Sequence, residues 1–309
     1  MSVERQLHKF GGSSLANPEC YRRVVNILKE YSQQDDLIVV SAAGKTTNKL
    51  IEFIDGLHKD GRLAHEALQE LKKFQTDLIE QLLDDESKEP LLAQLNDEFK
   101  LLGELTAPLS ETEQACVLGH GESWSSRLLA ALLNQNKLPS RTQDSRVFLR
   151  AEAGTQPEVD RGASYPLLKE VLAQHAHHRV VITGFMAQDK QGKTVLLGRN
   201  GSDYSATVIG ALAQVSRVTI WSDVAGVYSA DPRLVADACL LHCCALMKPV
   251  NLLVLLRLYC IAAPYSLSHK APWIVICVAV TSLNPARRAL NVCWLLVAVR
   301  KLFPHLMKC

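Results

Sequence analysis

Residues 37–44 read LIVVSAAG, a run of four apolar strand-forming residues that small residues and a glycine follow at once. An apolar run of this length is typical of a strand buried on both faces, as in a parallel sheet. The turn after it lies at the carboxyl end of the strand, where sheets of this kind bind ligands. The stretch therefore predicts an α/β fold with a ligand site beyond this strand.

Other strand-like segments flank this one at distances that leave room for helices. Leu7–Phe10 precedes it, and RVVITGF at 179–185, residues 195–197 and RVTIW at 217–221 follow it. Asn17-Pro18 supplies a helix cap and a proline at the first helical position after the first strand. Strands that alternate with helices predict βαβ units and a mainly parallel sheet.

Three further stretches have a helical pattern. Residues 49–105 are charged and amphipathic, with apolar residues three and four apart, and predict two or three helices outside the sheet. Residues 122–135 and 203–214 predict one helix each.

The bulk composition is that of an ordinary globular protein. The 309 residues, 48% of them hydrophobic, allow one large α/β domain or two smaller ones. A net charge of +2 without a basic stripe argues against a nucleic-acid partner. The first residues contain no apolar signal segment, so we expect a cytoplasmic protein with reduced thiols.

The composition changes abruptly after Asp237. All 32 acidic residues lie in 1–237, whereas 238–309 contain no Asp, Glu, Gly or Gln and hold all but two of the nine cysteines. We expect one domain over 1–237 and an anomalous tail over 238–309. The apolar runs of the tail are shorter than the roughly 20 residues of a membrane-spanning helix, which argues against a membrane partner.

No metal site is expected. The run His-Ala-His-His at 175–178 has no spaced Cys or Asp partners and predicts a solvated loop. The tail cysteines form no C-x-x-C pair.

The first glycine-rich turn runs from Lys9 through Gly11 and Gly12 to Ser13. Two glycines after a strand let backbone N–H groups approach a phosphate, and Lys9 can bring positive charge to a phosphoryl group in transfer. The alternative is a strand-ending turn with a solvent-exposed lysine.

The second turn contains Gly44-Lys45-Thr46 but is not a P-loop, because that motif needs a glycine where Val39 stands inside the strand. Two interpretations remain for Thr47: contact with a substrate, or a cap on the next helix.

The third motif is Gly119-His120-Gly121-Glu122. Glu122 is suited to the ammonium of an amino-acid substrate, and the alternative places it in the first turn of a helix, where a carboxylate favours the macrodipole. We expect His120 to be a loop histidine.

The fourth motif runs from Gly198 to Ser205. A flexible turn ends there in a helix N-terminus, which is a ready anion site, and Arg199 adds a bidentate fork for carboxylate or phosphate. The alternative for Asp203 is a helix N-cap.

The fifth motif, Ser222 to Tyr228 followed by Asp231-Pro232-Arg233, comes after a predicted strand. Backbone groups, Tyr228 and Arg233 are suited to hold a nucleotide. The alternative is an ordinary β-turn with a surface tyrosine.

In their order and wording these motifs resemble the aspartokinase family of the amino-acid-kinase superfamily. The stretches are KFGGSS, VVSAAG with TTN, GHGE, LLGRNGSDYSA and WSDVAGVYSADPR. The resemblance covers residues 6 to about 240 and is nearest to the N-terminal kinase part of bifunctional aspartokinase–homoserine dehydrogenases of the methionine branch. The chain lacks a Rossmann fingerprint, so no dehydrogenase activity is expected.

The resemblance implies a three-layer αβα sandwich that transfers phosphate from ATP, with Mg²⁺, to the side-chain carboxylate of L-aspartate, on the pathway to lysine, threonine and methionine. The implied catalytic residues are Lys9 and Asp203. The implied nucleotide contacts are Lys9, Gly11, Gly12, Ser13, Ser222, Asp223, Tyr228 and Arg233. The implied substrate contacts are Thr47, Glu122, Arg199, Asn200, Gly201, Ser202 and Asp203. Intact members are expected to be homo-oligomers. Glutamate and acetylglutamate kinases share the fold class, but the wording GRNGSDYSA favours aspartate.

Family members continue beyond the DPR motif with acidic sequence that residues 238–309 lack. The resemblance therefore implies that 1–237 is an incomplete catalytic domain. The loss of acids, the excess of cysteine and the end of the resemblance at one point predict a shifted reading frame from near Leu240–Leu241. A genuine membrane-associated tail is the alternative. The alternative function is a truncated remnant that binds nucleotide or a partner without turnover. An out-of-frame tail would leave apolar surface or sheet edges uncovered, so we expect poor solubility.

Overall fold

The centre of the fold is a parallel sheet. The computed structural model describes residues 5–155, 157–198, 200–222, 237, 274–279 and 297–298. Five strands lie in the order β3 (Ser140–Gln143), β4 (Arg179–Thr183), β2 (Leu37–Val40), β1 (Gln6–Phe10) and β7 (Arg217–Ser222). Every neighbouring pair among them is parallel. All four residues of β2 are buried, which confirms the central strand predicted from the sequence.

Two strands from the tail extend the sheet beyond β7. The strand β8 (Ile274–Ala279) pairs with β7 in parallel, and β9 (Val297–Ala298) pairs with β8 in antiparallel orientation. The expectation of an uncovered sheet edge is therefore wrong for β7, because backbone from the segment 238–309 occupies that edge.

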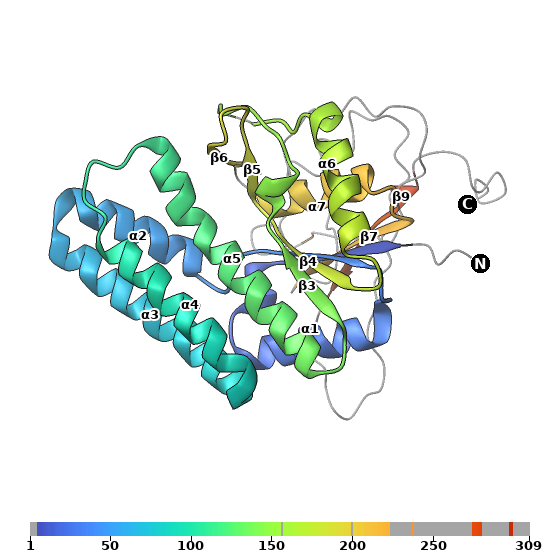
Figure 1. The fold of residues 1–309 in the computed structure, drawn as a ribbon, viewed down its shortest axis with the longest axis horizontal. Coiled ribbons are helices and arrows are strands. Elements are labelled where there is room, and N and C mark those ends of the chain that lie inside the picture. Colours follow the sequence, from blue (N-terminus) through green and yellow to red (C-terminus); the bar gives the residue numbers. More distant parts are fainter. Residues whose placement is uncertain are drawn as a thin grey trace.

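Helices cover both faces of the sheet (Figure 1). One face carries α1 (Pro18–Tyr31) and α5 (Glu111–Gln135), and the other carries α6 (Arg161–Gln174) and α7 (Gly201–Leu212). Short 3₁₀ helices, η1 (Gly12–Leu15) and η2 (Ser145–Val147), follow β1 and β3.

The two faces contribute to separate apolar clusters. Along β2, Ile38 and Val40 belong to the cluster under α1 and α5, whereas Leu37 and Val39 belong to the cluster under α6 and α7. Alternate residues of a strand point to opposite faces, so a strand that is apolar throughout serves both clusters. The predicted three-layer αβα sandwich is confirmed.

The charged, amphipathic stretch forms three helices beside the sandwich, as predicted. They are α2 (Thr46–Lys59), α3 (Gly61–Leu82) and α4 (Asp85–Gly103), and Figure 1 shows them grouped to the left of the sheet. No helix in the described part of the chain is long and apolar enough to cross a membrane.

Two sequence predictions about element positions are wrong. The helix expected from residue 122 starts at Glu111, because Ser110 and Glu113 form a capping box there. The strand expected at 195–197 is not part of the main sheet. The strand found there is β6 (Thr194–Leu196), and it pairs in antiparallel orientation with β5 (Met186–Gln188). A short loop can close an antiparallel hairpin, whereas a parallel pair needs a long crossover.

Candidate active site

Lys9 and Asp203 form a buried ion pair at the carboxyl end of β1. The Nζ of Lys9 contacts Oδ1 of Asp203, which lies in the first turn of α7. The side chains are only 7% and 13% exposed. The alternative of a solvent-exposed lysine is therefore wrong. Asp203 is not the N-cap either, since Asn200 holds that position, with a left-handed backbone at φ 58°.

The turn after β1 fits closely against the turn after β2. A Cβ added at Gly12 would lie 2.8 Å from the carbonyl oxygen of Ala42, and the N–H of Gly44 donates to the carbonyl of Gly12 over 2.9 Å. A Cβ added at Gly11 would lie 3.6 Å from Nζ of Lys9. Gly12 thus packs the turn tightly against the turn after β2, and Gly11 leaves the backbone beside Lys9 open, which fits the close approach of a phosphate.

A pair of serine hydroxyls links the end of β2 to α7, and the end of β4 packs tightly against the same part of α7. Ser41 Oγ lies 2.7 Å from Ser202 Oγ. A Cβ added at Gly184, which directly follows β4, would lie 2.5 Å from Cβ of Ser202. The same tight packing holds Gly201, where an added Cβ would lie 2.7 Å from the ring of Phe185. Sequence reasoning did not find Ser41, since its partner is far away along the chain.

Glu122 is a buried acid of the GHGE motif. It lies in the interior of α5 with 3% of its surface exposed, so its predicted alternative in a first helical turn is wrong. Oε1 accepts a hydrogen bond of 3.1 Å from the N–H of Ala42, and Oε2 has no partner among the described residues. Burial raises the pKa of Glu122 to about 8, although the hydrogen bond from Ala42 and the charge of Lys9 act in the opposite direction.

The glycines of the GHGE motif let α5 approach the site. A Cβ added at Gly121 would lie 2.6 Å from Cβ of Ala42, and one added at Gly119 would collide with the sulfur of Met186. His120 lies on the same helix rather than in a loop, with Nδ1 3.0 Å from the carbonyl of Cys116. The motif is therefore a close-packing device that brings Glu122 under the turn after β2.

Thr47 lies half-buried in the first turn of α2. The alternative of a helix cap is wrong for this residue, because Lys45 is the N-cap and α2 starts at Thr46. Thr46 is buried and accepts a hydrogen bond of 3.0 Å from Nε2 of Gln75.

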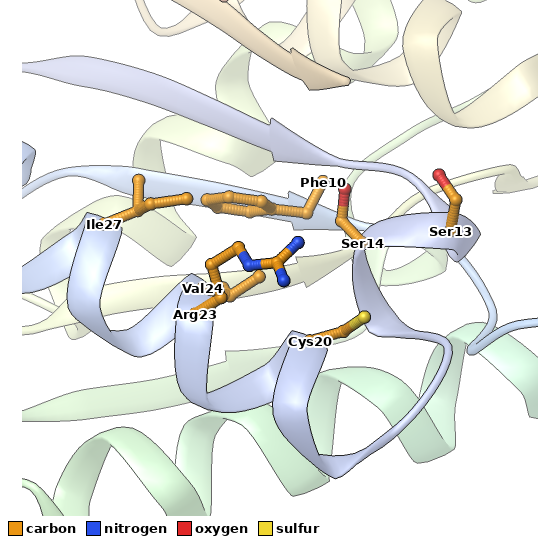
Figure 2. Close-up of a pocket in the computed structure, with 7 residues that line it drawn as sticks. All are labelled: Phe10, Ser13, Ser14, Cys20, Arg23, Val24 and Ile27. Atoms are coloured by element: carbon orange, nitrogen blue, oxygen red, sulfur yellow. The ribbon is translucent and has the colours of Figure 1, made fainter. Parts of the chain in front are cut away.

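Ser13 lies in η1 and borders a small hollow on the α1 side of the sheet. Its other lining residues are Phe10, Ser14, Cys20, Arg23, Val24 and Ile27. Figure 2 shows the guanidinium of Arg23 pointing from α1 toward Ser14. The hollow holds about 30 Å³, which suits water rather than a nucleotide.

Part of the predicted site lies outside the described residues. Arg199, Asp223, Tyr228 and Arg233 belong to this group. Ser222 is described as the last residue of β7. In the described part of the chain, no cluster of three or more His, Cys, Asp and Glu side chains could hold a metal ion.

The site combines a lysine in a buried ion pair with a buried acid. Lys9 and the Gly11–Gly12 turn suit a phosphate, and Glu122 suits an ammonium group. The sequence profile of the amino acid kinase family matches residues 4–248. The chain belongs to the amino acid kinase family.

Relatives within this family include aspartokinases. The chain is 58% identical over 238 residues to the bifunctional aspartokinase/homoserine dehydrogenase 2 of Escherichia coli (strain K12), which covers 77% of this chain and 29% of that relative. It is 30% identical over 236 residues to lysine-sensitive aspartokinase 3 of the same organism, covering 74% of this chain and 51% of that one. The chain thus spans under a third of the first relative and about half of the second.

A solved structure shares the fold. The crystal structure of E. coli aspartokinase III in complex with aspartate and ADP superposes with a TM-score of 0.69 at 27% identity. The match covers 89% of this chain and 62% of that one.

Proposed function

We propose that this chain carries the catalytic core of an aspartate kinase, which transfers the terminal phosphoryl group of ATP to the side-chain carboxylate of L-aspartate and yields 4-phospho-L-aspartate and ADP. The observation that carries the proposal is that the carboxyl ends of β1 and β2 bring together a buried cation, Lys9, and a buried acid, Glu122, one oxygen of which has no partner among the described residues. The first suits phosphate and the acceptor carboxylate, and the second suits the ammonium of an amino acid. Similarity to the two E. coli aspartokinases supports this choice of substrate.

Each side chain then has a role in positioning or in charge stabilisation, which phosphoryl transfer mainly requires. Lys9 stabilises negative charge on the transferring group, and Asp203 holds Lys9 in place. Glu122 and Thr47 bind aspartate, together with Arg199 and the start of α7. ATP, with Mg²⁺ to neutralise its phosphates, would supply the phosphoryl group. The residues that would hold the nucleotide are Gly11, Gly12, Ser13, Ser222, Asp223, Tyr228 and Arg233.

The test is aspartate-dependent formation of ADP by the purified chain, with the acyl phosphate trapped by hydroxylamine as a hydroxamate. Turnover that requires L-aspartate, and is not restored by L-glutamate, supports the proposal. Nucleotide binding without turnover would instead favour a truncated remnant that only binds.

For the tail we infer a shifted reading frame from near Leu240–Leu241, which its lack of acidic residues and its cysteine content support. Resequencing of the gene tests this inference. It fails if no single inserted or deleted base near these codons restores an acidic, family-like continuation. Sedimentation of the purified chain checks the expectation of poor solubility for this sequence, and sedimentation of a full-length family member checks the homo-oligomer expected for the intact family.

A further inference from the structure

The loop between β2 and α2, residues 41–45, connects several parts of the candidate site. The N–H of Ala42 holds Glu122. The N–H of Gly44 donates to the carbonyl of Gly12, in the turn after β1. The loop is therefore tied to Glu122 at Ala42 and to the turn after β1 at Gly44.

Two neighbouring residues of α3 contact this loop and the residue after it. Gly44 has a left-handed backbone with φ 54°, and a Cβ added there would lie 3.6 Å from Cζ of Phe74. Nε2 of Gln75 donates to Oγ1 of Thr46 over 3.0 Å, and the two residues are 2% and 1% exposed. The ring of Phe74 thus lies beside the loop, and the buried hydrogen bond from Gln75 holds Thr46, the residue that follows the loop.

Gln75 differs from the other buried residues of α3 because its side chain is polar. The structure describes α3 in full, and every other buried residue of this helix is Ala, Leu or Ile. Burial of an amide costs free energy unless the amide is hydrogen-bonded. The bond to Thr46 meets that requirement, and it couples α3 to the first turn of α2, which carries Thr47.

We propose that Gln75 is a positioning residue for the aspartate side of the site. It acts through Thr46, which fixes the start of α2 and the β2–α2 loop, and so sets the places of Thr47 and of the Ala42 N–H that holds Glu122. The inference rests on the proposed function for its substrate, but the mechanical link between α3 and the loop does not.

The first experiment measures the link without any ligand. Gln75→Leu removes the donor, and Gln69→Leu, an exposed position on the same helix, is the matched control. Amide hydrogen exchange of the full chain should become about fivefold to tenfold faster in a peptide spanning residues 41–50, because a buried hydrogen bond has been lost. The peptide that contains β4 should not change. Unchanged exchange in 41–50, or an equal acceleration of β4, overturns the proposal.

The second experiment measures the consequence for catalysis. In Gln75→Leu the KM for aspartate should rise about fivefold to tenfold while the KM for ATP stays within twofold. Thr46→Val removes the acceptor and should have the same effect, and the double variant should be no worse than either single one. Additive effects, or an equal rise in both KM values, overturn the proposal. If the wild-type chain does not turn over, the proposed function fails and the exchange result alone decides the role of Gln75.

Discussion

Asp203 and Glu122 are the two buried carboxylates of the candidate site, and they come from helices on opposite faces of the sheet. Asp203, from α7, is paired with Lys9. Glu122, from α5, has an oxygen without a partner among the described residues and a pKa raised by burial to about 8. The carboxyl end of the sheet therefore holds two acids in different environments: one is in an ion pair, and the other is buried where its ionised form is disfavoured. Asp203 balances the charge of Lys9, whereas the proposed partner of Glu122 is the ammonium group of the substrate.

The largest effect should come from Lys9, which carries the positive charge of the site. Lys9→Met keeps the apolar stem but removes the charge, so turnover should fall about a thousandfold. Steady-state ADP formation measures this, with the exposed Lys73→Met as the control. A variant that keeps a tenth of wild-type turnover would remove Lys9 from the mechanism.

Asp203 should matter next, because it compensates that buried charge. Asp203→Asn leaves the ammonium of Lys9 buried without a counter-ion, and the free energy of unfolding should drop by about 3 kcal/mol. Urea unfolding measures the loss.

The double variant of Lys9→Met with Asp203→Asn sharpens this test. It removes the orphaned charge and should recover part of the stability that Asp203→Asn loses. A double variant less stable than both single variants would show that the two side chains are not coupled as a pair.

Glu122 should make stability depend on pH in the opposite way from a salt-bridged acid. Its folded pKa of about 8 lies above the ordinary value of 4.5, so between these values the native state binds a proton that the unfolded state has released. The free energy of unfolding therefore falls as pH rises through this window.

Glu122→Gln has no such proton to lose. Its stability relative to wild type should rise by about 3 kcal/mol between about pH 5 and pH 8, measured by urea unfolding. Glu111→Gln, at an exposed position of the same helix, should leave the pH dependence of wild type in place. Identical pH dependence in wild type and Glu122→Gln would mean that Glu122 is ionised in the folded protein.

A smaller effect should follow from widening the contact between α5 and the β2–α2 loop. In Gly121→Ala the new Cβ would meet Cβ of Ala42 at 2.6 Å, so the free energy of unfolding should fall by about 1–2 kcal/mol. Gly61→Ala, where nothing lies within 4 Å of an added Cβ, should be neutral or stabilising. Equal effects in the two variants would contradict the close-packing role of the GHGE motif.

The sequence predicted the fold where the local signal was strong. β2, β4 and β7 are short runs rich in apolar residues. Asn17-Pro18 caps α1 as predicted, with Asn17 accepting from the N–H of Cys20. The edge strand β3 reads Ser-Arg-Thr-Gln, and no apolar run marks it. Helix α6 was not predicted, and it contains Pro166, a residue type that disfavours a helix interior.

The site was predictable in its residues and less so in its geometry. Glycine disfavours a helix interior by roughly 1 kcal/mol, so Gly119 and Gly121 hid the true start of α5. Close packing against Ala42 and Met186 explains why these two positions are glycine. The contacts of Ser41 with Ser202 and of Gln75 with Thr46 join distant segments, which no local pattern signals.

The most direct test counts the protons released when aspartate binds, because aspartate should displace one proton from Glu122. An ammonium group bound against this carboxylate favours its ionised form, so binding near pH 7 should release close to one proton for each aspartate bound. Calorimetry in two buffers of different ionisation enthalpy measures that number. We expect about one proton to be released for each aspartate bound by the wild type and none by Glu122→Gln. No release from the wild type, or the same release from Glu122→Gln, would contradict it.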